Sequence, residues 1–546
     1  MPPRPISAVA ADLGLTDDVL LPYGRDKAKV ELAALARPRT SAAPARLILV
    51  SALTPTPAGE GKTTTSIGLG EALHSMGLRT CLALREPSLG PVFGVKGGGT
   101  GGGACRLQPS AEINLHFTGD LHAVTAAHNL LAAMVDNHIH HGSAPRLDPG
   151  RVLWRRVMDM NDRALRQVIV GLGGTANGAP REAHFDITAA SEVMAVLCLA
   201  ADEADLRARL GRIVVGFTAE RKAVTAADLG AVGAMTALLR DALRPNLVQG
   251  NEGVPALVHG GPFANIAHGA NSLIATRMAL HLADWVVTEA GFGMDLGGEK
   301  FFDIVCAQTE LRPAAVVLVA TVRALKLHGG QPLAALATPD LGALRAGLPN
   351  LLHHVATVRR FGPPCVVAIN RFPTDTQDEL DLLVRLLAEQ GVACVPSDHY
   401  ARGGAGARAL AEAVVAAAVD PRPAFTPLYD RAAPLEDKLR ALAAGAYGAA
   451  AVALSRQARA DLQRIRKLGF EGLPLCVAKT QSSLTDTPGV LGAPAGHTLH
   501  VEGLREAVGA GFIVVMTGEI VRMPGLPKRP SALDVDVVDG QIVGVE

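Results

Sequence analysis

A short segment of the chain, Gly59-Glu60-Gly61-Lys62-Thr63, has the residue types of a phosphate-binding loop. In such a loop glycines let backbone N–H groups converge on phosphate oxygens, a lysine supplies positive charge and a threonine hydroxyl can ligate magnesium. The segment lacks the first glycine of the pattern G-x-x-x-x-G-K-[ST], because Thr56 stands at that position. We expect ATP or GTP to bind here, through Thr56, Pro57, Ala58, Gly59, Glu60, Gly61, Lys62 and Thr63.

Charged side chains follow two other apolar runs of the sequence. Arg85 and Glu86 come directly after Leu78–Leu84, and Glu289 ends another such run. An arginine beside a γ-phosphate can bind a second anion, such as the carboxylate that an ATP-driven ligase must activate. A strand-end glutamate can hold magnesium together with Thr63. The alternative interpretations are a structural ion pair for Arg85 and a plain strand-end carboxylate for Glu289.

These residues need a framework that brings strand ends together. Arg46–Leu53 is predicted as a strand, Lys62–Ser75 as a helix and Leu78–Leu84 as the next strand, so that the phosphate-binding turn lies at the carboxyl edge of a βαβ unit. Strand-like runs recur at Val168–Leu172, Arg212–Phe217, Asp284–Thr288, Ala314–Thr321, Cys365–Ile369 and Val392–Val395. The alternation predicts an α/β fold with a largely parallel, P-loop NTPase-like sheet core and additional smaller α/β domains.

Segments rich in glycine or proline mark the organisation of the chain. A glycine-dense loop at Phe93–Arg106 precedes a long helical pattern at His122–His140, and a proline-rich linker at Asp420–Asp430 closes one unit. We expect a nucleotide-binding domain at 1–360, a smaller α/β domain at 361–425 and a C-terminal α/β domain at 426–546.

The composition describes a protein that buries a large core and carries no net charge. Hydrophobic residues make up 49% of the 546 residues, and 52 Lys and Arg balance 52 Asp and Glu. The sequence has no basic stripe with interleaved aromatic residues, which argues against a nucleic-acid partner. The seven cysteines form no C-x-x-C pair, and the sequence shows neither a signal peptide nor a membrane span. We expect a cytoplasmic protein with no membrane partner.

Four further motifs are weaker. Gly97–Gly102 and Gly171–Ala176 fit the dinucleotide pattern G-x-G-x-x-G/A, but such matches mean little in a chain with 58 glycines. His259–Gly269 is similar to an esterase oxyanion loop, yet the chain has no G-x-S-x-G elbow. The histidines of Asp136–Gly142 point to different sides of a helix, which suits a polar helix end better than a metal site.

Longer stretches of the chain resemble the formate–tetrahydrofolate ligase family. They extend from about Thr54 to Lys528. They are "TPTPAGEGKTTTSIGL", "LREPSLGPVFGVKGGGTGGG", "INLHFTGDLHAV", "HFDITAASEVMAVLCLA", "VQGNEGVPALVHGGPFANIAHG", "VTEAGFGMDLGGEKFFDI", "VATVRALKLHGG", "AINRFPTDT", "KTQSSLTDTP" and "GFIVVMTGEIVRMPGLPK". In that family a residue other than glycine is usual at the position of Thr56.

The resemblance implies that ATP, formate and tetrahydrofolate give 10-formyltetrahydrofolate, ADP and phosphate through formyl phosphate. It implies that Lys62 and Arg85 flank the transferring phosphoryl group, with Glu86 beside them near the monovalent cation that activates the family. The pterin would stack between Phe372 and Tyr400, where the family more often has tryptophan at the second position; core packing is the alternative for Phe372. The family is typically a homotetramer.

Two other classes remain as alternatives. The loop also resembles those of regulatory and assembly ATPases of the MinD and nitrogenase iron-protein group, which often carry an additional lysine near the loop start, whereas Thr56-Pro57-Ala58 supplies none. A non-catalytic nucleotide-binding module is the third possibility. We expect a monofunctional ligase, because the sequence begins almost at its phosphate-loop domain.

Overall fold

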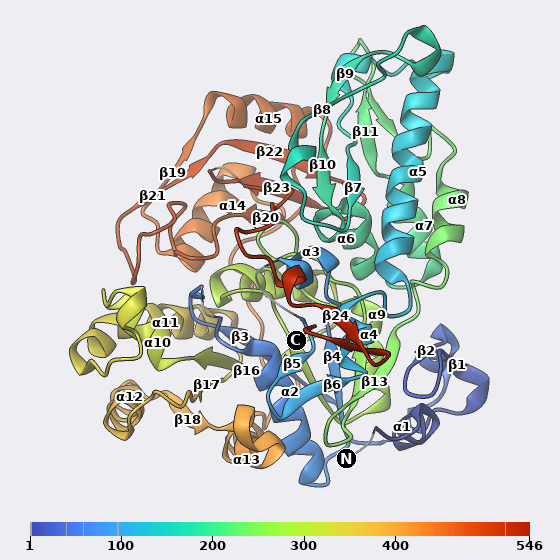
Figure 1. Ribbon diagram of the computed structural model, residues 1–546. Helices are drawn as coiled ribbons and strands as arrows, with labels where there is room; N and C mark the ends of the chain where they lie inside the picture. Colours follow the sequence, from blue (N-terminus) through green and yellow to red (C-terminus); the bar gives the residue numbers. More distant parts are fainter. Residues whose placement is uncertain (1–2, 40, 58, 95–97, 519, 546) are drawn as a thin grey trace.

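The centre of the computed structural model is one large, mostly parallel β-sheet (Figure 1). The structure describes residues 3–39, 41–57, 59–94, 98–518 and 520–545. Among these residues the sheet has 12 strands, and its main path runs β1-β2-β13-β14-β4-β15-β3-β16-β17-β18. The pairings from β14 to β18 are parallel, whereas β1, β2 and β13 form an antiparallel edge. The strands are β1 (Leu20–Pro22), β2 (Ala28–Val30), β3 (Arg46–Ala52), β4 (Thr80–Leu84), β13 (Asn246–Gly250), β14 (Pro255–Val258), β15 (Trp285–Glu289), β16 (Pro313–Ala320), β17 (Cys365–Asn370) and β18 (Ala393–Ser397), with β5 (Gly101–Gly102) and β6 (Cys105–Gln108) beside β13.

Both faces of the sheet are covered, so its central strands are hydrophobic along their length. In β3, Leu47 and Leu49 join one core cluster while Ile48 and Val50 join another. The first cluster includes α5 (Asp120–His141), α6 (Glu192–Leu199), α9 (Leu273–Leu282), α10 (Val322–His328), α11 (Leu341–Phe361) and α12 (Gln377–Glu389). The second includes α2 (Lys62–Ser75) and α13 (His399–Ala417). None of the helices in the described parts of the chain combines the length and apolar character that a membrane span requires.

The predicted elements around the phosphate loop are confirmed, but two predicted strands lie elsewhere. The helix at Lys62–Ser75 has the predicted bounds. The predicted runs near residues 168 and 212 form β8 (Val168–Val170) and β11 (Val214–Phe217), which lie outside the central sheet. They pair antiparallel with β9 (Arg181–Ala183) and β12 (Ala223–Thr225), in the part of Figure 1 near α5 and α8 (Val232–Leu239). A hairpin satisfies their backbone groups locally, so they do not extend the parallel sheet.

The last part of the chain builds its own small core. A separate hydrophobic cluster draws its buried members from residues 429–515. It is formed by α14 (Leu435–Leu442), α15 (Arg456–Lys467), β19 (Ala451–Leu454), β20 (Leu475–Ala478), β21 (Thr498–Val501), β22 (Gly503–Ala507) and β23 (Phe512–Met516), drawn in orange to red in Figure 1. We call this part the C-terminal unit. The sheet continues across the predicted boundary at 360, because β17 pairs with β16; the division into 1–360, 361–425 and 426–546 stays a prediction.

Candidate active site

The loop between β3 and α2 contains two glycines in the left-handed conformation. Gly59 has φ 74° and Gly61 has φ 75°. A Cβ atom on Gly61 would also lie 2.5 Å from the side-chain nitrogen of Asn370, so neither the backbone nor the space there tolerates a side chain. Gly61 directly precedes Lys62, the first residue of α2. The first turn of this helix presents backbone N–H groups in the arrangement that binds phosphate.

Thr56 and Glu60 fasten this loop from inside. Glu60 Oε1 accepts hydrogen bonds from the backbone nitrogen of Thr56 at 2.8 Å and from its hydroxyl at 2.9 Å. Both side chains are buried, and burial raises the pKa of Glu60. Asn370, at the end of β17, donates to the backbone oxygen of Glu60 at 2.9 Å. The threonine in place of glycine thus supplies a second donor to the loop. Pro57 is exposed, and Ala58 lies outside the described residues.

Four predicted side chains meet at the carboxyl ends of β4 and β15. Arg85 Nη2 lies 3.0 Å from Glu289 Oε1, and the Thr63 hydroxyl donates to Glu289 Oε2 at 2.8 Å. Burial lowers the pKa of Lys62. The negative charge of Glu289 opposes this shift, and the positive charge of Arg85 adds to it. The Arg85 side chain is 23% exposed and that of Glu289 is 4% exposed. The ion pair that was the alternative interpretation of Arg85 is therefore present, and its arginine remains accessible to an incoming anion.

Glu86 lies in a buried group of charges beside this cluster. It is 4% exposed, and within the described chain its Oε2 has no hydrogen-bond partner. Burial raises its pKa well above the ordinary value, and the negative charges of Asp120 and Asp159 act in the same direction. Lys29 opposes them, but its amine already pairs with Asp120 at 2.7 Å. A carboxylate in these surroundings gains from a further positive charge.

The two predicted aromatic residues follow neighbouring parallel strands, Phe372 after β17 and Tyr400 after β18. The guanidinium carbon of Arg323 lies 3.6 Å from the centroid of the Phe372 ring. Tyr400 is 54% exposed, and its backbone oxygen accepts a hydrogen bond from Ala104 N at 2.8 Å. A Cβ on Gly103 would lie 2.2 Å from that oxygen, so the glycine-dense loop packs directly against Tyr400. One aromatic face is thus covered by a cation and the other ring is largely open.

The whole chain is similar to known proteins. The profile of the formate–tetrahydrofolate ligase family matches residues 1–546. The chain belongs to this family. A formate–tetrahydrofolate ligase of Paracoccus denitrificans (strain Pd 1222) is 58% identical over 546 residues, covering 99% of this chain and 97% of the relative. Those of Methylobacterium sp. (strain 4-46) and Hyphomonas neptunium (strain ATCC 15444) are 56% and 54% identical, each covering 99% of this chain and 98% of the relative.

In this member of the formate–tetrahydrofolate ligase family, a buried histidine that the sequence analysis missed links the two candidate sites. His399 Nε2 lies 3.1 Å from the hydroxyl of Thr65 in α2, and its Nδ1 lies 2.9 Å from the hydroxyl of Ser397 in β18. Burial lowers the pKa of His399 to about 4, so the ring is neutral at pH 7. His399 thereby ties the phosphate-loop helix to the segment that carries Tyr400. Its only signal in the sequence is its position next to that tyrosine.

A second network fastens the start of the phosphate loop to the C-terminal unit. The Thr54 hydroxyl lies 3.0 Å from His354 Nε2 and accepts from Asn350 Nδ2, also at 3.0 Å. The same Asn350 nitrogen donates to the backbone oxygen of Gly492 at 2.8 Å, and His328 bonds to both Thr54 O and Gly492 N. His328 lies on α10, and Asn350 and His354 lie on α11, where periodicity alone gives no reason to single them out.

Two of the weaker motifs, Gly171–Ala176 and the histidines near the end of α5, lack the surroundings that a site would need. Gly171–Ala176 lies in the connection between β8 and β9, which contains only the short 3-10 helix Thr175–Asn177 and no α-helix. Gly97 of the other glycine motif lies outside the described residues. The three histidines near the end of α5 are not part of a metal-binding group, and no such group of three or more His, Cys, Asp or Glu is found among the described residues. The phosphate loop and the charges around it are therefore the best-formed candidate site.

Proposed function

We propose that this protein joins formate to tetrahydrofolate with ATP, giving 10-formyltetrahydrofolate, ADP and phosphate, in the cytoplasm. The observation that carries the proposal is the cluster of Lys62, Arg85, Thr63 and Glu289 beside the phosphate loop, in a chain that belongs to the formate–tetrahydrofolate ligase family. Two cations at one sheet edge suit a reaction that brings two anions together. The order of strand β3, phosphate loop and helix α2 in a largely parallel sheet supports a P-loop NTPase-like core.

A formyl phosphate intermediate follows from the chemistry of formate. Its carboxylate resists attack by an amine because the leaving group is poor, so a carboxylate oxygen first attacks the γ-phosphorus and ADP departs. N10 of tetrahydrofolate then attacks the formyl carbon, phosphate leaves and the nitrogen loses its proton. Lys62 and Arg85 offset the repulsion between formate and the γ-phosphate in the first step. Arg85, with a planar fork of donors, is the residue suited to orient formate or formyl phosphate.

Thr63 and Glu289 fit the magnesium ion that accompanies ATP. The hydroxyl and carboxylate oxygens are adjacent, at 2.8 Å, and oxygen is the donor that magnesium takes. Magnesium usually keeps several waters and binds one or two protein oxygens plus phosphates. A cluster of several carboxylates is therefore not required. The ion, when bound, neutralises phosphate charge; Thr63 and Glu289 hold it at the loop.

Glu86 fits the activating monovalent cation. The Glu86 Oε2 atom has no hydrogen-bond partner within the described chain, and the neighbouring Asp120 and Asp159 add negative charge. A monovalent cation bound there would stabilise the ionised carboxylate. Glu86 would hold this cation next to Arg85 without contacting the reacting atoms itself.

The folate site is proposed at Phe372 and Tyr400, within the segment 361–425. Flat heterocycles stack on aromatic faces, and both residues follow the carboxyl ends of strands at the edge where the phosphate loop lies. His399 connects this segment to α2 through Thr65. We also propose a homotetramer, as is typical of the family.

Dependence of ADP release on both co-substrates tests the function. The expected result is ADP formation that requires formate and tetrahydrofolate together, and its loss by roughly several powers of ten in Lys62→Ala, because a cation at the phosphoryl group is removed. Lys467→Ala, at an exposed position of α15, is the matched control and should retain activity. Turnover without formate would instead favour a regulatory or assembly ATPase, and near-normal activity of Lys62→Ala would refute the assignment of the loop.

A further inference from the structure

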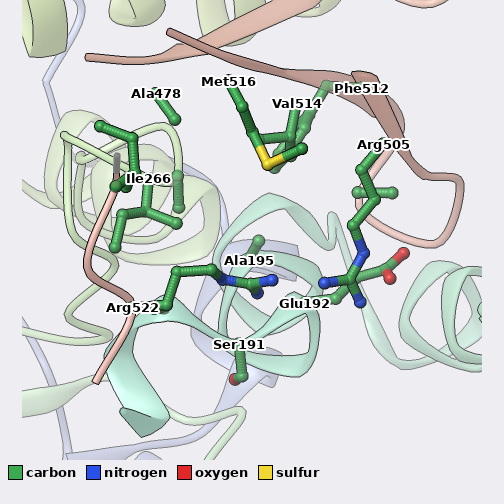
Figure 2. A pocket seen from close by; sticks show the side chains of 14 residues that line it. Ser191, Glu192, Ala195, Ile266, Ala478, Arg505, Phe512, Val514, Met516 and Arg522 are labelled. Atoms are coloured by element: carbon green, nitrogen blue, oxygen red, sulfur yellow. The ribbon is translucent and has the colours of Figure 1, made fainter. Parts of the chain in front are cut away.

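A small cavity lies between the start of α6 and the strands β22 and β23 of the C-terminal unit (Figure 2). Its volume is about 40 Å³, and most of its lining is apolar, including Ala195, Ile266, Phe512 and Val514. No residue of the phosphate loop lines it, and neither Arg85 nor Glu289 does. The cavity is therefore distinct from the candidate active site.

Two arginines extend into this apolar space. In Figure 2 the guanidinium groups of Arg522 and Arg505 approach each other from opposite walls. Arg522 Nη2 pairs with Asp186 at 2.7 Å, but its Nε has no hydrogen-bond partner among the described residues. Arg505 makes a long contact of 3.4 Å to the backbone oxygen of Leu153. The unpaired Nε of Arg522 and the single long contact of the Arg505 guanidinium thus leave N–H donors beside the cavity that both residues line.

The charges around the cavity do not balance. Asp186 pairs with two arginines. Arg522 binds its Oδ2, and Arg155 Nη1 lies 3.1 Å from its Oδ1. Glu192 accepts from the backbone nitrogens of Gly509 and Ala510, at 2.8 and 3.3 Å. The negative charge of Glu506 opposes the lowering of the Arg505 pKa by burial, but this glutamate is already paired with Arg464 at 3.0 Å. Three arginines therefore face Asp186 and Glu192.

Burial further reduces the negative charge that can balance these arginines. It raises the pKa of Glu192 to about 7, so that near neutral pH this residue carries only part of a negative charge. Burial together with the like charges of Arg505 and Arg155 lowers the pKa of Arg522 to about 9. Positive charges held together in apolar surroundings cost free energy, which a bound anion would offset.

We propose that this cavity binds one small oxyanion, either inorganic phosphate or a carboxylate of formate size, through Arg505 and Arg522. Guanidinium forks match the oxygen geometry of both anions. A cavity of about 40 Å³ holds a few water molecules or one such ion, and it excludes a nucleotide or a pterin.

Crystallography of the unaltered protein tests the site directly. Crystals soaked in selenate, a tetrahedral oxyanion with an anomalous signal, should show a peak within hydrogen-bond distance of Arg505 and Arg522. Water alone in the cavity at saturating selenate would overturn the proposal. This readout is independent of catalysis, so a failure of the proposed ligase activity would leave it unaffected.

Calorimetric titrations with phosphate and, separately, with formate distinguish the two anions. Saturating ADP is present in every titration, so that the nucleotide site at the phosphate loop is occupied. We expect one of them to show a binding component that is at least tenfold weaker in Arg522→Gln. Arg529→Gln is the matched control, because Arg529 is an exposed arginine of the same segment that pairs with Asp534. If Arg522→Gln fails to fold, Ala195→Leu, which fills the cavity and keeps both arginines, should weaken the same component. Unchanged binding in the folded variant would contradict the proposal.

Discussion

Glu289 determines how the groups beside the phosphate loop are arranged. One of its oxygens pairs with Arg85 from the end of β4, and the other accepts the hydroxyl of Thr63 from α2. A single buried carboxylate thus contacts both the residue proposed to bind formate and the residue proposed to bind magnesium. We infer that the binding of formate at Arg85 and the binding of magnesium at Thr63 are coupled, because both involve the carboxylate of Glu289.

Replacing Arg85 by lysine should impair formate use. An ammonium group retains the charge but cannot make the bidentate contacts of a guanidinium, and a hydrogen bond to a charged group is worth about 1.5–3 kcal/mol. We expect kcat/KM for formate to fall by roughly 10- to 100-fold, with a higher KM and a lower kcat. Arg39→Lys is the control, because Arg39 pairs with Asp284 at the opposite end of β15 with similar exposure. An unchanged formate response in Arg85→Lys would restrict Arg85 to the ion pair.

Tyr400 tests the folate site. Removing its ring in Tyr400→Ala should weaken tetrahydrofolate binding by about 1–3 kcal/mol, the range measured for stacking of bases on aromatic side chains. Tyr400→Trp should bind folate equally well or more tightly, since a ring that is 54% exposed has room to become larger. Titration of tetrahydrofolate at saturating ATP and formate measures both variants. Unaltered folate dependence in the alanine variant would leave Tyr400 with a packing role against the glycine-dense loop.

The helix that follows the phosphate loop carries a buried acid. Glu71 of α2 is 1% exposed, and its Oε1 accepts from the backbone nitrogen of Glu252 at 3.1 Å. Glu252 in turn accepts from Gly404 N of α13 at 2.9 Å. Burial raises the pKa of Glu71 to about 7, and the charge of Glu252 acts in the same direction. Three segments therefore pack around a carboxyl group that favours its protonated form.

This arrangement predicts that stability falls as pH rises. Between its ordinary value of 4.5 and its folded value of about 7, Glu71 binds more proton in the folded than in the unfolded state. Its stabilising contribution is complete below pH 4.5 and is lost through pH 7, by at most about 1.4 kcal/mol per pH unit. Urea unfolding at pH 5.5 and 8 should show a smaller difference for Glu71→Gln than for the unaltered protein. Glu412→Gln, which changes an exposed glutamate of α13, should retain the full difference; equal pH dependence in both variants would contradict the prediction.

At the scale of the whole molecule, a buried ion pair joins the C-terminal unit to the central sheet. Lys479, directly after β20, lies 3.3 Å from Asp295, which follows β15, and both side chains are 0% exposed. The lysine also donates to the backbone oxygens of Thr480 and Thr485, at 3.0 and 3.2 Å. Its amine lies 5.1 Å from the ring centroid of Tyr447. The unit thus contacts the segment after β15 through an ion pair that has no access to water.

Breaking this pair should cost far more than removing a surface lysine. Lys479→Ala leaves Asp295 buried and unpaired, which typically costs 3–5 kcal/mol, or about a third of the stability of an ordinary domain. Lys467→Ala on the surface of α15 should change stability by no more than about 0.5 kcal/mol. The double variant Lys479→Met with Asp295→Asn should recover part of the loss, because no charge is left unpaired. Urea midpoints measure all three, and a Lys479→Ala midpoint equal to that of the surface control would rule out this role.

The sequence by itself determined the local elements and the residues that line the loop. The strand, glycine turn and helix from Arg46 to Ser75 were predictable because apolar runs, left-handed glycines and helical periodicity act over a few neighbouring residues. For the same reason the long helix at Asp120–His141 lies close to its predicted range. Membership of the family was also readable, because the matching stretches extend over most of the chain.

Only the tertiary structure decided which strands are neighbours, and hence which side chains meet. β15 lies between β3 and β4, so Glu289 contacts Thr63 and Arg85, which are 226 and 204 residues away in sequence. The run at Val168–Val170 has the same local pattern as a central strand, yet it pairs in a separate hairpin. Strand order is set by packing and hydrogen bonding between distant segments, and local periodicity carries no information about either.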